Sequence, residues 1–127
     1  MKRCARFALP IAAAILAALP AHSQQTDPLQ RGRRLFLQCA ACHSIGTEVA
    51  GKIGPALSGV VGRPAGRFAD PKPSPALAAV DFRWTPERLD AWLAAPQAVA
   101  PGTSMLLVGI DNMAARADLI AYLTSLR

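Results

Sequence analysis

Three segments of the chain carry apolar residues with the period of an amphipathic helix. They cover about 28–38, 86–95 and 112–126, and each follows a residue suited to start a helix: Asp27, Thr85 and Asn112. Short apolar runs such as Leu106-Leu107-Val108 lack the flanking turn residues of a hairpin. The pattern predicts an all-α protein with three main helices, in which Pro96 ends the second.

The helical period disappears between the first two predicted helices. Glycines and prolines interrupt the whole stretch from residue 44 to residue 83, so no regular element is expected there. A structureless stretch of this length is uncommon inside a compact domain. Its apolar side chains would need a partner that the chain itself does not supply.

The segment Cys39-Ala40-Ala41-Cys42-His43 indicates what that partner is. CxxCH is the attachment motif of a c-type haem: the two thiols add to the porphyrin as thioethers, and the histidine offers an imidazole nitrogen to the iron. One covalent haem c is therefore expected. The long loops would wrap it with Leu57, Val60, Val61, Phe68, Leu77, Val80 and Phe82.

The N-terminus reads as a secretory signal peptide over residues 1–23. Lys2, Arg3 and Arg6 precede an apolar run that is short for a membrane span, and Ala21-His22-Ser23 supplies small residues for cleavage. An uncleaved membrane anchor is the alternative. Residues 24–127 then form a single domain, which we expect to be exported to a bacterial periplasm as a monomer without stable membrane insertion.

Removal of this leader changes the charge and the set of possible ligands. The whole chain has a formal charge of +6, and three of its cations lie in the leader, which leaves +3. No basic stripe interleaved with aromatic residues points to nucleic acid. The only histidine that remains is His43, and the only methionines that remain are Met105 and Met113.

The second axial position of the iron can be assigned by elimination. Met113 is expected to pack at the start of the last helix, whereas Met105 follows the Pro101-Gly102 turn on a loop that can present a thioether to a metal. We therefore predict His43 and Met105 as the metal ligands. An iron with both positions filled by protein changes valence without binding substrate, which favours electron transfer over catalysis.

The chain resembles the class I monohaem cytochromes c of the mitochondrial and c2-like branch, over about residues 29–126. The matching pieces lie in family order: Gly32-Arg33-Arg34-Leu35-Phe36, the CxxCH motif, Ile53-Gly54-Pro55-Ala56-Leu57, Val61-Gly62-Arg63, Trp84-Thr85, Pro101-Gly102-Thr103-Ser104-Met105, and residues 116–123. The resemblance implies the small cytochrome c fold. It also implies a one-electron carrier that meets donor and acceptor redox proteins transiently.

Further site residues follow from the resemblance alone. Pro55 corresponds to the residue whose carbonyl accepts the ring N–H of the haem-ligating histidine. Arg63 and Trp84 correspond to donors to a haem propionate. Gly32 and Phe36 would face Leu119 and Tyr122 where the first and last helices cross.

The sequence also departs from the family. Pro73 stands before Ser74 where relatives carry a tyrosine, and Trp92 replaces a tyrosine that lies near the methionine sulfur in many relatives. Gln97, Ala98 and Ser104 occupy positions that are often lysine. Strong electrostatic docking is therefore not expected.

Other functions of the motif remain open alternatives. A thioredoxin-like dithiol would need a βαβ setting, and a zinc site would need a fourth ligand besides Cys39, Cys42 and His43. A five-coordinate haem that binds a gas or peroxide, and a haem c subunit of a dehydrogenase complex, would use the same attachment motif.

Overall fold

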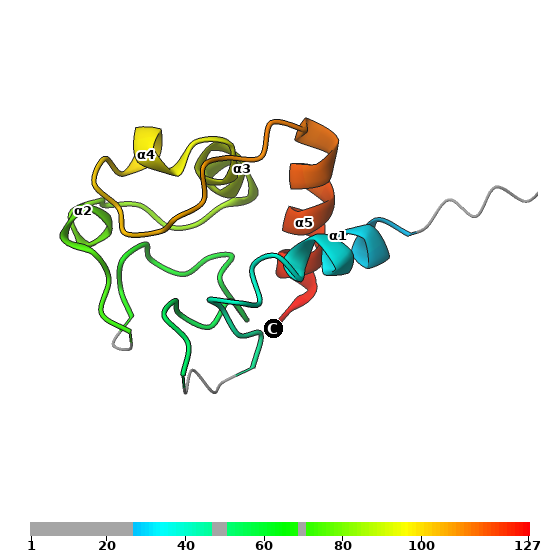
Figure 1. The fold of residues 1–127 in the computed structure, drawn as a ribbon, viewed down its shortest axis with the longest axis horizontal. Coiled ribbons are helices and arrows are strands. Elements are labelled where there is room, and N and C mark those ends of the chain that lie inside the picture. The colour runs from blue at the N-terminus through cyan, green and yellow to red at the C-terminus, as the bar shows by residue number, and fades with distance from the viewer. Residues whose placement is uncertain (1–26, 47–50, 69–70) are drawn as a thin grey trace, which may run out of the picture.

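The computed structural model describes residues 27–46, 51–68 and 71–127. The predicted signal peptide, residues 1–23, lies outside this part. Within it the elements are five helices: α1 Pro28–Phe36, α2 Pro75–Ala78, α3 Pro86–Ala94, α4 Pro96–Val99 and α5 Met113–Ser125. Figure 1 shows α1 crossing α5, with α3 and α4 on one side of the molecule and the loops of residues 37–46 and 51–68 on the other.

The three main helices begin where the sequence predicts them. The side chains of Asp27, Thr85 and Asn112 each accept a hydrogen bond from a backbone N–H in the first turn of the helix that follows. Such a bond satisfies one of the four donors that a helix start leaves without a partner in the helix. These local contacts explain why the starts were readable from the sequence.

Two short helices were not expected. The prolines of the middle segment were treated as breakers, yet Pro75 opens α2 behind the N-cap Ser74, and Pro96 opens α4 directly after α3. A proline in the first turn lacks only an N–H that has no helical partner anyway, so it can begin a helix as well as end one. The described residues contain no β-strand, only an isolated antiparallel β-bridge between Pro64 and Arg83.

The predicted crossing of the first and last helices is confirmed at Gly32. A β-carbon placed there would lie 2.1 Å from the Asp118 carbonyl oxygen and 2.7 Å from the Tyr122 β-carbon. Beside this close approach, the rings of Phe36 and Tyr122 pack with centroids 5.8 Å apart. Glycine is therefore required because two helix backbones meet here.

An ion pair reinforces the crossing from the side. The Arg31 Nε donates to Asp118 Oδ2 at 2.6 Å, and a second guanidinium nitrogen donates to Asp118 Oδ1 at 2.8 Å. This two-point contact holds the pKa of the Asp118 carboxyl below its ordinary value, first through the hydrogen bond and then through the opposite charge.

Among the described residues, no helix has the length and apolar character needed to cross a membrane.

We predict that Gly32→Ala destabilises the protein. The added methyl group would collide with the Asp118 carbonyl and the Tyr122 side chain, at a cost of about 1–3 kcal/mol in the free energy of unfolding. Urea unfolding measures the change. Gln30→Ala, at an exposed position of α1, is the matched control and should leave stability nearly unchanged. Equal unfolding curves for Gly32→Ala and the parent protein would contradict the close helix crossing.

We also predict that the Arg31–Asp118 pair makes stability depend on pH in the acidic range. A carboxyl whose pKa is lowered by folding contributes stability above its unfolded pKa and loses it as the pH falls through its folded pKa. Asp118→Asn should remove this part of the acid sensitivity, which urea titrations at descending pH can measure. Asp81→Asn, on an exposed loop, is the control. An Asp118→Asn profile parallel to that of the parent protein would argue against the prediction.

Candidate functional site

A cavity of about 240 Å³ lies between the helices and the loops. One wall consists of apolar side chains from three helices, namely Phe36, Leu89, Trp92, Leu93, Leu119 and Leu123. The loops form the rest. All the site residues expected from the sequence line this one cavity: Cys39, Cys42, His43, Pro55, Arg63, Trp84 and Met105. Residues separated by more than sixty positions are thus brought to a common site.

The imidazole of His43 is held in one orientation. Its Nδ1 lies 2.8 Å from the carbonyl oxygen of Pro55. Because a carbonyl can only accept, Nδ1 carries the proton and Nε2 keeps a free lone pair for a metal. The backbone of Gly54 closes against the ring, where a β-carbon would lie 2.4 Å from the His43 Cε1. The contact expected from Pro55 is therefore present, and Gly54 is part of the same support.

The two cysteines stand one helical turn apart. The Cys42 N–H donates to the Cys39 carbonyl at 3.0 Å, and both thiols are free. Burial raises the pKa of the Cys39 thiol, and the neighbouring Cys42 adds to the rise. Redox-active dithiols instead need a lowered pKa to supply a thiolate. The environment of Cys39 therefore does not favour a thioredoxin-like function.

Met105 begins an extended segment whose side chains alternate between two sides. Met105 and Leu107 are half-buried, whereas Leu106 is 90% exposed and Val108 is 96% exposed. This alternation is the two-residue period of an extended chain. It places the thioether of Met105 in the cavity wall.

The expectation that Met113 packs in an apolar setting is wrong. Its side chain is 71% exposed, at the first position of α5, and it does not line the cavity. The apolar residues around it in the sequence belong to other faces of the helix. Met113 is thus excluded by its position outside the cavity and not by packing, and Met105 is the described methionine that lines the cavity.

Arg63 and Trp84 are both fixed by contacts within the protein. The two terminal nitrogens of Arg63 donate to the carbonyl oxygens of Ala56 at 2.9 Å and Ser58 at 2.7 Å. Burial lowers the pKa of this guanidinium. Trp84 is buried and meets the ring of Trp92 edge-on, with centroids 5.3 Å apart. Arg63 thus supports the loop after Pro55, a role that the sequence did not reveal.

The apolar loop residues divide into two groups. Leu57, Val60 and Phe68 line the cavity as expected, and so does Leu77, which the structure places on α2 and not on a loop. The other three expected residues, Val61, Val80 and Phe82, are partly buried and pack against the protein core instead. The expectation that all seven residues line the cavity is therefore only partly met, because three of them pack against the protein core.

The residues of this cavity fit a covalently attached haem. The apolar walls suit a porphyrin, and the same cavity is lined by two free thiols, an imidazole with a free Nε2 and a thioether. Arg63 supplies a cation at the same site for a propionate. Within the described ranges, no cluster of three or more histidine, cysteine, aspartate or glutamate residues could hold a bare metal ion.

Comparison with known proteins gives a consistent result. The Cytochrome c family profile matches residues 29–127. Over 88 residues the chain is 46% identical to the cytochrome c-type cyt cy of Rhodobacter capsulatus. The aligned region covers 69% of this chain but only 43% of that protein. It is 38% identical over 99 residues to the cytochrome c2 of Rhodomicrobium vannielii, with 78% of each chain covered.

A solved structure supports the same relationship. The fold of the chain resembles cytochrome cH from Methylobacterium extorquens with a TM-score of 0.70 and 38% identity, covering 76% of this chain and 97% of that one. The expected cytochrome c fold is confirmed. The chain belongs to the class I cytochrome c family of electron-transfer proteins, on its c2-like branch, with Cys39 and Cys42 as the attachment points of covalent haem c.

Proposed function

We propose that this protein carries single electrons between redox proteins in a bacterial periplasm, on one haem c whose axial ligands are His43 and Met105. The observation that carries the proposal is the single cavity that both side chains line together with Cys39 and Cys42. Haem c supplies a reversible one-electron couple when bound. The protein supplies its attachment, its ligands and its surroundings.

The two proposed ligands are held by different means. The Pro55 carbonyl and the Gly54 backbone fix the imidazole of His43, which limits its rotation and leaves Nε2 directed away from Pro55. Met105 is presented by an extended segment rather than a helix. Together they would leave no open position for oxygen or peroxide, and a methionine raises the potential relative to a second histidine.

The apolar surroundings of the proposed haem site favour a low reorganisation energy for electron transfer. The cavity walls contributed by α1, α3 and α5 are apolar, so little water would need to reorient when the iron changes charge. Arg63 and the indole N–H of Trp84, both from segments between the helices that line the cavity, are suited to a propionate. These assignments rest on the family resemblance together with their positions in the cavity.

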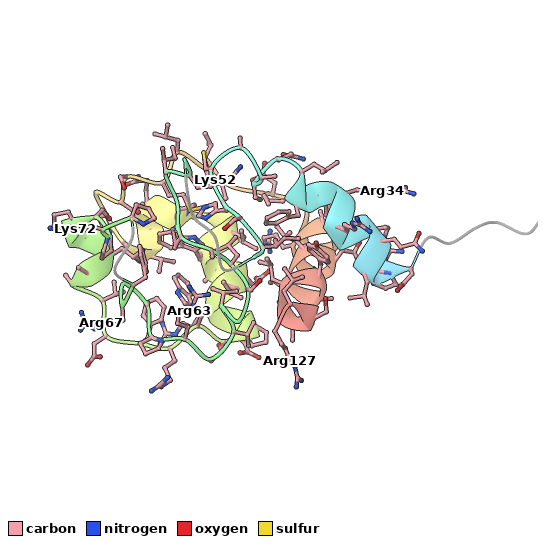
Figure 2. All side chains as sticks on the ribbon, turned by 90° about the horizontal axis from the view of Figure 1, so that it is seen from below. Arg34, Lys52, Arg63, Arg67, Lys72 and Arg127 are labelled. Atoms are coloured by element: carbon pink, nitrogen blue, oxygen red, sulfur yellow. The ribbon has the colours of Figure 1, made fainter. Side chains whose placement is uncertain are left out.

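The mouth of the cavity is mainly apolar, although the exposed Lys72 also lines the cavity. Ile53 and Leu106 line the cavity and are 73% and 90% exposed. In Figure 2 the basic side chains of Arg34, Lys72 and Arg127 lie at separate edges of the molecule. We therefore propose donor and acceptor proteins that bind transiently, through a small contact with limited electrostatic steering.

Export to the periplasm is proposed from the leader pattern of residues 1–23.

We predict that Met105→Ala leaves one coordination position of the haem iron without a protein ligand. The variant should lose the absorption band that methionine ligation gives at the red end of the ferric spectrum, and its ferrous form should bind carbon monoxide rapidly. Spectroscopy with potentiometry tests this, and the midpoint potential should fall. The matched control is Met113→Ala, which removes an exposed methionine and should change neither property. A parent protein that already binds carbon monoxide rapidly would instead favour a five-coordinate sensor or peroxidase.

We also predict a weak dependence of the electron-transfer rate on ionic strength. With a formal charge of +3 after loss of the leader and an apolar cavity mouth, the rate with an exogenous redox protein should change by less than about tenfold over the physiological salt range. Stopped-flow mixing at stepped salt concentrations measures it. A steep fall of the rate with added salt would contradict the proposed apolar contact.

A further inference from the structure

The turn before Met105 is held by the side chain of Gln97. Gln97 lies on α4, and its Nε2 donates to the Thr103 carbonyl at 3.0 Å while its Oε1 accepts from the Gly102 N–H at 3.0 Å. The two contacts fix the orientation of the amide, because exchanging its oxygen and nitrogen would oppose two donors and two acceptors. One side chain therefore binds the turn through both of its polar atoms.

These bonds lead directly to Met105. Thr103 is 7% exposed, and its backbone N–H donates to the Ala100 carbonyl at 3.0 Å. Its hydroxyl oxygen accepts from the Met105 N–H at 3.5 Å. Gly102 has a φ of 87°, a left-handed conformation that glycine adopts without strain. The conformation that Gln97 stabilises thus determines where the Met105 backbone begins.

The other end of the Met105 segment is anchored on the core. The Ile110 N–H donates to the Leu93 carbonyl of α3 at 2.8 Å. Arg116 of α5 donates to the Ile110 carbonyl at 2.7 Å, and its guanidinium also binds Asp90 of α3. This end is therefore tied to two of the main helices.

The beginning of the segment has no comparable support from a long helix. It follows α4, which has four residues and no side-chain hydrogen bond at its N-cap. Val108 is 96% exposed, and Leu106, which lines the cavity at its mouth, is 90% exposed. Thr103 is buried, but Pro101 and Gly102 of the turn are exposed, so the two hydrogen bonds of Gln97 are an important restraint on the turn.

We propose that Gln97 is a positioning residue that keeps the sulfur of Met105 in place, and so limits how often Met105 leaves its axial position. The inference rests on the proposed His43 and Met105 ligation. Gln97 does not itself touch the haem site, since it is absent from the cavity wall. Its effect passes through Gly102 and Thr103 to Met105.

The test is the rate at which the haem-loaded ferrous protein binds carbon monoxide, because an external ligand can bind only after Met105 has left. Gln97→Ala removes both bonds and should raise this rate by about tenfold. Gln97→Glu keeps the acceptor for Gly102 but loses the donor to Thr103, so an intermediate rate is expected. Gln30→Ala, an exposed glutamine on α1, should match the parent protein.

Two further measurements separate the possible results. The urea midpoint of global unfolding should change little in Gln97→Ala, since the exposed Gln97 side chain contributes to one turn and not to the packing of the main helices, while the red-end absorption band should disappear at lower urea than in the parent. Equal carbon monoxide rates in Gln97→Ala and the parent protein would overturn the proposal. Loss of the band only together with global unfolding would overturn it as well. A parent protein without the band would instead refute the proposed ligation itself.

Discussion

The cavity between the helices and the loops is the constraint on which the rest of this structure depends. The main helices pack only through α1 with α5 and α3 with α5, so one face of each remains directed to the cavity. Large apolar side chains on both sides would lose contact area if the space were filled by water. A rigid apolar group bound there completes the core. The described residues between 44 and 83 line this cavity at many positions, so the length of that segment suits the enclosure of such a group.

Side chains bonded to backbone carbonyls hold the loops where no regular secondary structure does. Pro55 orients His43, Arg63 binds the carbonyls of Ala56 and Ser58, and Gln97 binds the turn before Met105. In each case a polar side chain satisfies a backbone group that would otherwise lack a partner. The site is therefore built from few helices and a small number of directed hydrogen bonds.

The features that could be predicted from the sequence are local or have a fixed spacing. The helix starts at Asp27, Thr85 and Asn112 depend on bonds within one turn, and the CxxCH motif reads as a unit. The helix crossing at Gly32 was accessible only through the family resemblance, since a glycine in a helix does not by itself reveal what lies opposite.

The features that were missed depend on the tertiary structure. Pro75 and Pro96 begin short helices, and a four-residue helix has too few positions to show a period. Met113 was assigned to the interior because its neighbours are apolar, yet the direction of α5 turns it to solvent. The two bonds of Gln97 join residues five and six positions apart, a spacing that no helix or strand pattern marks.

The central claim is that the cavity holds an iron ligated by His43 and Met105. X-ray absorption spectroscopy at the iron edge of the haem-loaded protein tests it most directly, because sulfur scatters differently from nitrogen and oxygen. The account predicts one sulfur ligand to the iron besides nitrogen, in both the ferric and the ferrous state. An iron surrounded by nitrogen and oxygen alone would contradict it.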